Sequence, residues 1–329
     1  MKNSVSEHIT KVKNKVIHIR ILITGASGFI GKHLLDKLLK TSDRIACIDL
    51  IFNQAFIEKY GDKVQLFTGN ILDRSFVAKC IRDFLPDFVF HLAGSKNRTN
   101  SLSEFKSSNE INYLGTLNLF EALLKTKNLK LVTILGTIDE YGYSVTPFKE
   151  DSHELPNSAY GLSKLSATKL AIIFYHQFNL PVVVLRPSIA YGPDQGEEMF
   201  IPALIMTLLK HEPFKMTEGN QLRDFIYIDD LVDALIKLKN CNGLNGSILN
   251  IASGNSVMIK DIALKIAEIM DRREKLKIGE VPYRSSEIMD YSVDISKAST
   301  LLKWHPKTKL KVGLERTIAF YKKNLDNEA

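Results

Sequence analysis

The sequence predicts an α/β fold: a doubly wound parallel sheet with a smaller α/β lobe attached. Apolar, β-rich runs alternate with amphipathic helical segments through the first half of the chain, as expected for a parallel sheet covered by helices. The first of these runs ends in a glycine-rich turn. The chain has 329 residues, which is more than one compact core usually holds, so a second lobe is expected.

The composition is that of an ordinary globular protein. Hydrophobic residues make up 45% and charged residues 25%, which argues against disorder. The net charge is +7, but Lys and Arg are spread along the chain, which suits anionic substrates better than nucleic acid. No apolar run reaches the roughly 18–20 residues of a membrane span. Three separated cysteines predict no disulfide framework and no metal site, and they fit a reducing cytoplasm: Cys47, Cys80 and Cys241.

The alternation of strands and helices suggests how the chain is divided. Residues 1–15 are polar and lack the apolar core of a signal peptide, so they are expected to form a flexible extension. A dinucleotide-binding domain is expected over 16–185, and about 226–254 should return to it. From residue 186 the alternation becomes irregular. The segments of about 186–225 and 255–329 are therefore expected to form a substrate-binding lobe.

A glycine turn follows the first apolar run, 16–24, and leads into an amphipathic helix. Strand, glycine turn and helix together are the context of a dinucleotide fingerprint. Glycine lets the backbone approach a pyrophosphate, whose charge then lies at the positive helix N-terminus. The pattern predicts a Rossmann-type sheet, with cofactor contacts from Gly25, Ser27, Gly28, Phe29, Ile30 and Gly31.

Asp49 ends the next predicted strand, 44–48, about 20 residues after the glycine turn. A carboxylate at this point can accept hydrogen bonds from the adenosine ribose hydroxyls. It would also repel a 2′-phosphate, and no Arg or Lys follows it immediately. The sequence therefore favours NAD over NADP as the cofactor.

Two further predicted strands, 64–68 and 88–92, end near short polar or small residues. Ligands of parallel sheets bind at the carboxyl ends of the strands. We expect Asn70 and Ile71 near the adenine, and small residues that leave room for the cofactor at Leu92, Ala93 and Gly94. Common loop chemistry is the alternative explanation for each of these residues.

Tyr160 and Lys164 lie four residues apart at the start of a helical segment that runs to about Phe178. This spacing places both side chains on one helix face. A neighbouring ammonium favours the phenolate and lowers the pKa of a tyrosine toward the range useful for acid–base work. Thr137 follows the predicted strand 131–135, where its hydroxyl can lie over the cofactor, although capping or turn formation is its commoner role.

The rest of the chain gives a less regular pattern. An aliphatic strand should follow Arg223-Asp224-Phe225, and Asp229-Asp230 resembles a helix N-cap. Residues 284–294 are polar and are expected to form a loop. The other expected elements are helices over 109–124, 259–270 and 311–323 and strands over 182–185 and 248–251.

Taken together, these residues resemble the extended short-chain dehydrogenase/reductase family that acts on nucleotide sugars. The resemblance spans about residues 17–325. The matching elements, in chain order, are TGASGFIG (24–31), HLAG (91–94), NYLGTLNL (112–119), Thr137 with Tyr141-Gly142, YGLSK (160–164), LRPSIAYGP (185–193) and RDFIYIDD (223–230).

The resemblance implies a role for each matching residue. Tyr160 would be the acid–base, Lys164 would orient the nicotinamide ribose and lower the tyrosine pKa, and Thr137 would hold the reacting sugar oxygen. Arg223 would lie near the nucleotide diphosphate. Further contacts to the substrate are expected from Asp139 and, by looser similarity, from Arg284 and Glu287. The family also implies a homodimer formed through the helices that carry Asn112 and Tyr160.

This chain departs from the family pattern in three places. Gly136 precedes Thr137 where many relatives have a serine pair, and Ile189 stands where an Asn near the diphosphate is usual. Dehydratases of the family place acids directly after the Thr. Here Ile138 occupies the first of those positions, and Asp139 and Glu140 follow, so one of them could serve as a base.

These observations predict a cytoplasmic, NAD-dependent enzyme that transfers hydride at C4 of a nucleotide-activated hexose, as a 4-epimerase or a 4-ketoreductase. A nucleotide-sugar 4,6-dehydratase is the alternative within the same family. An alternative of another class is a dinucleotide-binding regulator without catalysis. Binding to nucleic acid or to a membrane is not expected.

Overall fold

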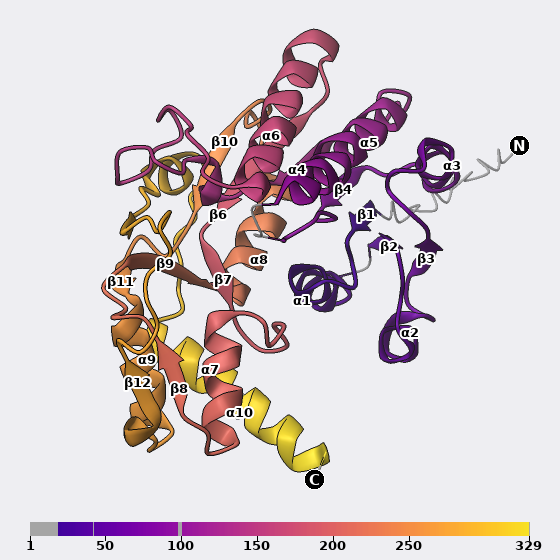
Figure 1. Cartoon of the computed structure of the whole chain (residues 1–329). Helices are drawn as coiled ribbons and strands as arrows, with labels where there is room; N and C mark the ends of the chain where they lie inside the picture. Colours follow the sequence, from indigo (N-terminus) through magenta and orange to yellow (C-terminus); the bar gives the residue numbers. More distant parts are fainter. Residues whose placement is uncertain (1–18, 42, 98–100, 329) are drawn as a thin grey trace, which may run out of the picture.

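A computed structural model describes residues 19–41, 43–97 and 101–328 (Figure 1). The extension predicted for 1–15 lies outside the described residues. The first strand begins at Arg20, so the residues before 19 in the predicted run of 16–24 also lie outside them.

The predicted α/β fold is confirmed by a seven-stranded parallel sheet in the order β10-β6-β5-β4-β1-β2-β3. The chain starts in the middle of this sheet, moves outward through β2 and β3, and then crosses β1 to build the other half. This reversal of direction makes the sheet doubly wound. Its strands are β1 (Arg20–Thr24), β2 (Arg44–Asp49), β3 (Gln65–Thr68), β4 (Phe88–His91), β5 (Leu131–Leu135), β6 (Val182–Pro187) and β10 (Ile248–Ile251).

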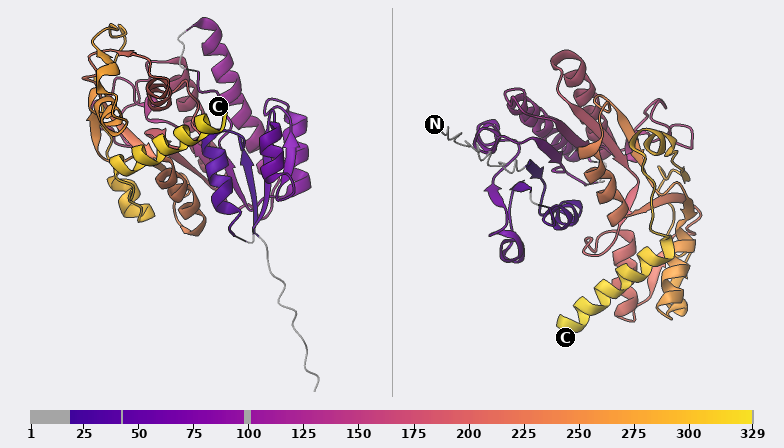
Figure 2. Two further views of the ribbon diagram at one scale, coloured as in Figure 1. Left: turned by 90° about the horizontal axis from the view of Figure 1, so that it is seen from below. Right: turned by 180° about the vertical axis from the view of Figure 1, so that it is seen from behind.

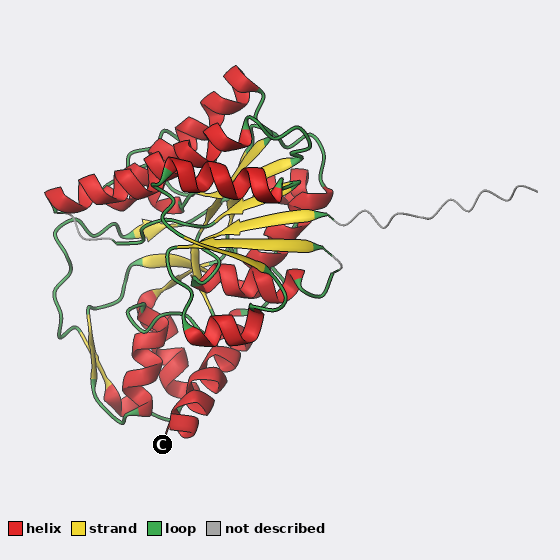
Figure 3. Ribbon diagram, turned by 90° about the vertical axis from the view of Figure 1, so that its right-hand side faces the viewer, coloured by secondary structure: helices red, strands yellow, loops and turns green. Residues whose placement is uncertain are grey.

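Helices cover both faces of this sheet, above and below the strands in Figure 3. Successive strand residues point to opposite faces, so Ile21 and Ile23 pack in one core and Leu22 packs in the other. The first core also takes the buried sides of α1 (Phe29–Leu38), α2 (Gln54–Tyr60) and α8 (Ile228–Lys237). The second core takes those of α3 (Arg74–Phe84), α5 (Gly115–Leu123) and α6 (Ala159–Phe178).

The helix predicted over 109–124 starts earlier than expected. It begins with α4 (Leu102–Asn109) and continues through a π-helical turn at Glu110–Leu114 into α5. The Ser101 hydroxyl starts it by accepting a hydrogen bond from the Glu104 amide at 3.2 Å. Leu102 is 91% exposed and the buried positions of α4 are polar, so this turn lacks the apolar periodicity that marks a helix in the sequence.

A second lobe lies beside the carboxyl ends of the large sheet. Its segments, drawn in pink to yellow in Figure 2, are far apart in the sequence but lie together. One small sheet joins β7 (Ile189–Tyr191), β9 (Leu222–Tyr227), β11 (Ser256–Met258) and β13 (Asp290–Tyr291). A two-stranded sheet pairs β8 (Phe214–Met216) with β12 (Leu276–Ile278). The helices are α7 (Phe200–Leu209), α9 (Ile259–Ile269) and α10 (Leu310–Glu328).

Three details of the lobe differ from the sequence-based expectation. Arg223-Asp224-Phe225 lies inside β9 rather than before it, and β13 forms within the predicted loop 284–294. The N-cap of α8 is Tyr227, so Asp229 and Asp230 are not caps. The Asp230 carboxylate instead accepts hydrogen bonds from the amides of Lys307 and Thr308, both at 3.0 Å, and so anchors the segment before α10.

Candidate functional site

A cavity of about 620 Å³ opens at the carboxyl ends of the parallel strands. Ligands of doubly wound sheets bind at this edge. Thr137 lines the cavity together with every residue predicted to contact the cofactor: Gly25, Ser27, Gly28, Phe29, Ile30, Gly31, Asp49, Asn70, Ile71, Leu92, Ala93, Gly94, Tyr160 and Lys164. One space therefore joins the glycine turn to the Thr–Tyr–Lys set.

The glycine turn has no room for side chains at two positions. Gly25 has a φ of +69°, and a Cβ there would lie 2.6 Å from the Ala93 nitrogen. A Cβ at Gly31 would overlap the Gly25 carbonyl oxygen. The helix α1 starts after Gly28 without a side-chain cap, and its first turn lines the cavity. This uncapped N-terminus fits the pyrophosphate of a dinucleotide, because its amides and dipole favour an anion.

Asp49 is held in place at the end of β2 by the glycine turn. Its Oδ2 accepts hydrogen bonds from the Ser27 amide at 2.8 Å and from the Ser27 hydroxyl at 2.7 Å. Its Oδ1 accepts one from the Leu50 amide at 2.8 Å. Each carboxylate oxygen has two lone pairs, so Oδ1 retains acceptor capacity for a ribose hydroxyl.

Tyr160 and Lys164 occupy the first two turns of α6. This helix starts as predicted because the Ser158 hydroxyl accepts a hydrogen bond from the Gly161 amide at 3.0 Å. Burial lowers the pKa of Lys164 to about 8, and the negative charge of Glu140 acts in the opposite direction. A Cβ at Gly94 would lie 2.7 Å from Oδ1 of Asn112, so the glycine makes room for that amide.

Thr137 serves both of the roles considered for it in the sequence. It lines the cavity, and it is also the N-cap of the 3₁₀ turn Ile138–Glu140. Its hydroxyl accepts a hydrogen bond from the Asp139 amide at 3.2 Å. Its own amide donates to Oε1 of Glu140 at 2.9 Å.

Asn112 is a site-supporting residue that sequence reasoning missed. Its Nδ2 donates to the Ser163 hydroxyl at 2.8 Å, and its Oδ1 accepts from the Ser95 amide at 2.8 Å. These bonds tie the loop after β4 to α6 beside Lys164. The signal in the sequence was a buried-type position occupied by Asn within an apolar helical segment, but a helix alone does not reveal its partners.

His91 has a structural role between the strands and α5. Its Nδ1 lies 2.6 Å from the Thr24 hydroxyl, and its Nε2 lies 3.0 Å from the Thr116 hydroxyl. Burial, helped by the charge of Lys164, lowers the pKa of His91 to about 3, so the imidazole is neutral. A neutral ring between two hydroxyls joins β1, β4 and α5 behind the cavity.

The segment after β6 supplies a wall of the cavity that sequence reasoning did not assign. Its contributing residues are Pro187, Ser188, Ile189, Ala190, Gln195, Gly196 and Met199. Two ion pairs join this segment to α1 and to the loop after β4: Lys32–Asp194 and Lys96–Glu198. The sequence showed a turn-rich stretch that matches a family element, but it could not show these ion pairs, because they join residues that are about 100 or more positions apart.

Four residues predicted to contact the substrate are not among those lining the cavity: Asp139, Arg223, Arg284 and Glu287. Arg223 and Glu287 lie together, because the guanidinium forms an ion pair with the carboxylate and stacks over the Tyr291 ring at 4.7 Å. Arg284 is exposed in the same loop, where its carbonyl oxygen accepts a hydrogen bond from the Glu287 amide at 3.0 Å.

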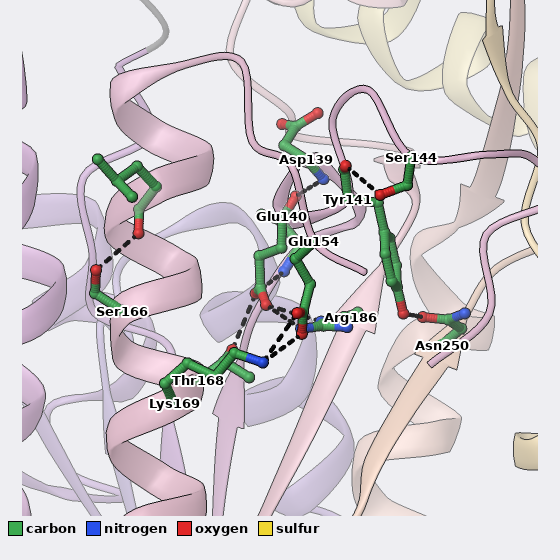
Figure 4. Close-up of polar contacts among 12 residues, drawn as sticks. Asp139, Glu140, Tyr141, Ser144, Glu154, Ser166, Thr168, Lys169, Arg186 and Asn250 are labelled. Carbon is green, nitrogen blue, oxygen red and sulfur yellow. Dashed lines mark hydrogen bonds and ion pairs between the residues drawn. The ribbon is translucent and has the colours of Figure 1, made fainter. Parts of the chain in front are cut away.

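The acids after Thr137 do not face the cavity. Ile138 is buried in a small apolar cluster with Tyr141 and Phe148. Glu140 is fully buried, and its carboxylate is enclosed by donors that include the Arg186 guanidinium (Figure 4). Of the two acids that could serve as a base, Glu140 is therefore not placed to act on the substrate, because its carboxylate points into the protein.

The family is established by comparison with known proteins. A model of the NAD dependent epimerase/dehydratase family matches residues 21–252, which is more than half of the chain. The match begins in β1 and ends just after β10, so it contains the glycine turn and the Thr137, Tyr160 and Lys164 positions. The chain belongs to this family.

Individual relatives cover nearly the whole chain and differ in activity. A UDP-N-acetyl-α-D-glucosaminuronate decarboxylase of Bacillus cytotoxicus is 28% identical over 92% of this chain and 98% of its own. A dTDP-glucose 4,6-dehydratase of Salmonella typhimurium is 27% identical over 93% of each. The crystal structure of a UDP-glucuronic acid 4-epimerase from Bacillus cereus, in complex with UDP-glucuronic acid and NAD, is 30% identical. It matches with a TM-score of 0.86 over 93% of this chain and 100% of that chain.

In the parts of the chain that the structure describes, no helix combines the length and apolar character needed to cross a membrane. Within the same residues, no group of three or more His, Cys, Asp or Glu side chains is arranged to hold a metal ion.

Proposed function

We propose that the protein binds NAD and transfers hydride at C4 of a nucleotide-activated hexose, as a 4-epimerase or a 4-ketoreductase. The observation that carries this proposal is that Thr137, Tyr160 and Lys164 line the same cavity as the glycine turn and Asp49. A dinucleotide-binding regulator without catalysis would not require a tyrosine and a lysine beside the place of the nicotinamide.

NAD fits the residues of the cavity. The uncapped N-terminus of α1 suits the pyrophosphate, and Asp49 suits an unphosphorylated adenosine ribose. The Bacillus cereus 4-epimerase of similar fold was crystallised with NAD. Bound NAD supplies the hydride acceptor and donor; the chain supplies position and electrostatics.

The roles of the three polar residues follow from their chemistry. In the oxidising direction Tyr160 removes the proton of the C4 hydroxyl as hydride leaves C4, and Thr137 holds the oxygen. Lys164 stabilises the phenolate of Tyr160 from the next helical turn. Lowering a tyrosine pKa by about three units takes roughly 4 kcal/mol, which the ammonium and the positive nicotinamide ring supply together.

The surroundings of Thr137 favour epimerase or reductase chemistry over 4,6-dehydration. Dehydration at C5 and C6 needs an additional acid and base near the sugar. Ile138 is apolar and buried, and the Glu140 carboxylate is bound inside the protein. Neither Asp139 nor Glu140 is among the residues that line the cavity.

We further propose that the second lobe holds the nucleotide part of the substrate. Arg223 is the cation assigned to the diphosphate, with Arg284 and Glu287 in the same neighbourhood. Because Arg223 is paired with Glu287 in this structure, the diphosphate has to compete with that carboxylate, or the loop has to shift when substrate binds.

The proposal is tested by incubating the purified protein and NAD or NADH with UDP-, dTDP-, GDP- and CDP-hexoses and their 4-keto-6-deoxy forms. Product identity and net nicotinamide oxidation are measured together. A C4 epimer without net oxidation identifies an epimerase, and stoichiometric NADH consumption identifies a reductase. A 4-keto-6-deoxy product would establish the dehydratase instead, and NAD binding without any turnover would support the regulator.

Replacing Asp49 with Asn is expected to weaken NAD binding about 10- to 100-fold. The reason is the loss of a hydrogen bond to a charged acceptor, which contributes about 1.5–3 kcal/mol. Discrimination against NADP should fall as well, because the charge that repels the 2′-phosphate is gone. Isothermal titration calorimetry with NAD and with NADP measures both affinities. The control is Asp36→Asn, a carboxylate on α1 that pairs with Lys59 and is outside the cavity lining; equal effects in both variants would refute the assignment.

The protein is expected to form a homodimer through the α4–α5 and α6 region. Leu102 is 91% exposed on α4, and Leu162 on α6 is also exposed, which leaves apolar surface at the helices concerned. The substitution Leu102→Glu should shift the sedimentation coefficient from that of a dimer to that of a monomer. Leu301→Glu, in the second lobe, is the control and should leave it unchanged. A wild-type monomer at micromolar concentration would rule the dimer out.

A further inference from the structure

Behind the cavity wall lies a buried carboxylate that the proposed chemistry does not use. Glu140 is completely buried, and its two oxygens meet four donors from three elements. Oε1 accepts from the Thr137 amide at 2.9 Å and from the Thr168 hydroxyl at 3.1 Å. Oε2 accepts a hydrogen bond from Nε of Arg186 at 2.8 Å and forms an ion pair with Nη2 of the same guanidinium at 2.7 Å.

These contacts join the two halves of the Thr–Tyr–Lys set. Thr137 follows β5, whereas Thr168 lies on α6 one helical turn after Lys164 and so on the same side of the helix. Arg186 comes from β6. A single carboxylate therefore fixes the backbone of Thr137 relative to the helix that carries Tyr160 and Lys164.

The donors around Glu140 favour the ionised form of its carboxylate, against the effect of burial. Burial raises the pKa of Glu140, while the Arg186 guanidinium, the Thr137 amide and the Thr168 hydroxyl act against that rise. Three of its four contacts are N–H groups that can only donate, so the oxygens act as acceptors. Arg186 is itself completely buried and stacks on the Tyr141 ring at 4.5 Å.

The backbone next to Glu140 leaves space for its carboxylate. A Cβ at Gly136 would overlap Oε1 of Glu140 and would lie 3.2 Å from Cγ of Arg186. Glycine at 136, a departure from the serine of many relatives, is thus the residue that makes room for the Glu140–Arg186 pair. Gly136 and Glu140 therefore belong to one arrangement.

We propose that Glu140 is a positioning residue for the hydride-transfer chemistry proposed above: it fixes the backbone of Thr137 to α6 and places its carboxylate against the side of α6 that carries Lys164. This inference rests on the proposed function for its catalytic consequence. Its electrostatic part concerns Lys164 itself and is measurable without any substrate.

The charges around Lys164 make Glu140 the group to test. Glu140 opposes the effect of burial and raises the pKa of Lys164, whereas His91 on β4 is neutral. On α4, which packs against α6, Glu104 directs its carboxylate to Ser108 and to Asn97. On β6, Arg186 is neutralised by the carboxylates that it binds.

The substitution Glu140→Gln retains the size of the side chain and removes its charge. We expect the pKa of Lys164 to fall below its value of about 8, because the negative charge that opposes the effect of burial is removed. The measurement is the rate of Lys164 acetylation by acetic anhydride at a series of pH values, read by peptide mass spectrometry on the folded protein. This readout needs neither substrate nor turnover.

The matched control is Glu154→Gln. Glu154 also binds Arg186, with Oε1 2.9 Å from Nη2, and it holds Lys169 at 2.8 Å (Figure 4). It makes no hydrogen bond to Thr137 or Thr168, and it is not among the charges that shift Lys164. In this control variant the pKa of Lys164 should equal that of the wild type. The proposal would be overturned if the pKa of Lys164 is unchanged in Glu140→Gln, or if it falls equally in both variants.

Turnover gives the second readout. If Lys164 must be cationic, the lower pKa of Lys164 in Glu140→Gln reduces kcat more at pH 8 than at pH 7, so the alkaline limb of the pH profile moves to lower pH. If no nucleotide sugar turns over in the wild type, the proposed function fails while the acetylation result still decides the role of Glu140.

Thr168→Val tests whether Glu140 positions Thr137 relative to α6. It also provides a test of the proposal if the Glu140→Gln variant does not fold. It removes one hydrogen bond between α6 and the carboxylate and retains every charge. We expect a lower kcat, an unchanged KM and an unmoved Lys164 titration. A kcat equal to that of the wild type would overturn the positional role.

Discussion

Tyr160→Phe is expected to reduce turnover by about 10²–10⁴-fold while NAD binds with nearly unchanged affinity. The substitution removes only the phenolic oxygen, which is the proposed acid–base, and general acid–base catalysis typically contributes this much. The ring itself still lines the cavity. Steady-state kinetics on the active nucleotide sugar, together with calorimetric titration of NAD, separates the two effects.

The control for this substitution is Tyr143→Phe, which makes the same chemical change at a tyrosine that is 58% exposed and outside the cavity lining. Its kcat and KM should equal those of the wild type. Turnover that survives in Tyr160→Phe would show that another group moves the proton, and the assignment of the acid–base would be wrong.

Arg186→Met is expected to lower the free energy of unfolding by about 3–5 kcal/mol. Removing one partner of a buried ion pair leaves an uncompensated charge, which costs about this amount. Here the stranded group is Glu140, whose Oε2 loses both of its donors. Urea denaturation followed by circular dichroism measures the change.

The pH dependence of this loss has a definite sign. Without Arg186, burial raises the pKa of Glu140 in the folded protein above its unfolded value. Such a group contributes stability below its unfolded pKa, and that contribution is lost as the pH rises through the folded pKa. The destabilisation of Arg186→Met should therefore be larger at pH 8 than at pH 5.

Two further variants check that the loss comes from the stranded charge. Glu140→Val combined with Arg186→Met removes both charges and should recover most of the stability, because buried pairs can be replaced by apolar side chains at little cost. Arg74→Met breaks the exposed Arg74–Glu121 pair and should change stability by less than about 1 kcal/mol. A loss in Arg186→Met no greater than in Arg74→Met would contradict the account.

Local patterns explain which parts of the site could be predicted from the sequence. The glycine turn and Asp49 are recognisable because their chemistry depends on neighbours in the chain: a strand before them, a helix after them and a fixed spacing. Tyr160 and Lys164 are recognisable for a similar reason, because they lie about one helical turn apart in the chain. The structure places these residues, and Thr137, around one cavity.

Contacts between distant segments explain what the sequence could not reveal. Glu140 and Arg186 are 46 residues apart, and nothing in either local pattern indicates that a fully buried ion pair will form. Asn112 likewise meets Ser163 across 51 residues. Gly136 could be noted as a departure from a family pattern, but its reason, the space taken by a carboxylate, needs three-dimensional coordinates.

The same limit applies to the second lobe. Arg223 and Glu287 were both assigned to substrate, and their mutual ion pair was not foreseen because β9 and the loop before β13 meet only in the fold. The helix α4 was missed for a different reason: its buried positions are Glu104 and Ser108, so the usual apolar stripe is missing.

The central claim is that hydride leaves C4 of the sugar for the nicotinamide. It is tested most directly by supplying a UDP-hexose deuterated at C4, starting with UDP-glucose and UDP-glucuronic acid, and locating the deuterium by mass spectrometry and NMR. The account predicts deuterium at C4 of a product with the inverted C4 hydroxyl, or on the nicotinamide when a keto-sugar is released. Loss of the C4 deuterium to water would contradict hydride transfer, and deuterium recovered at C6 of a 4-keto-6-deoxy sugar would contradict the epimerase or reductase assignment.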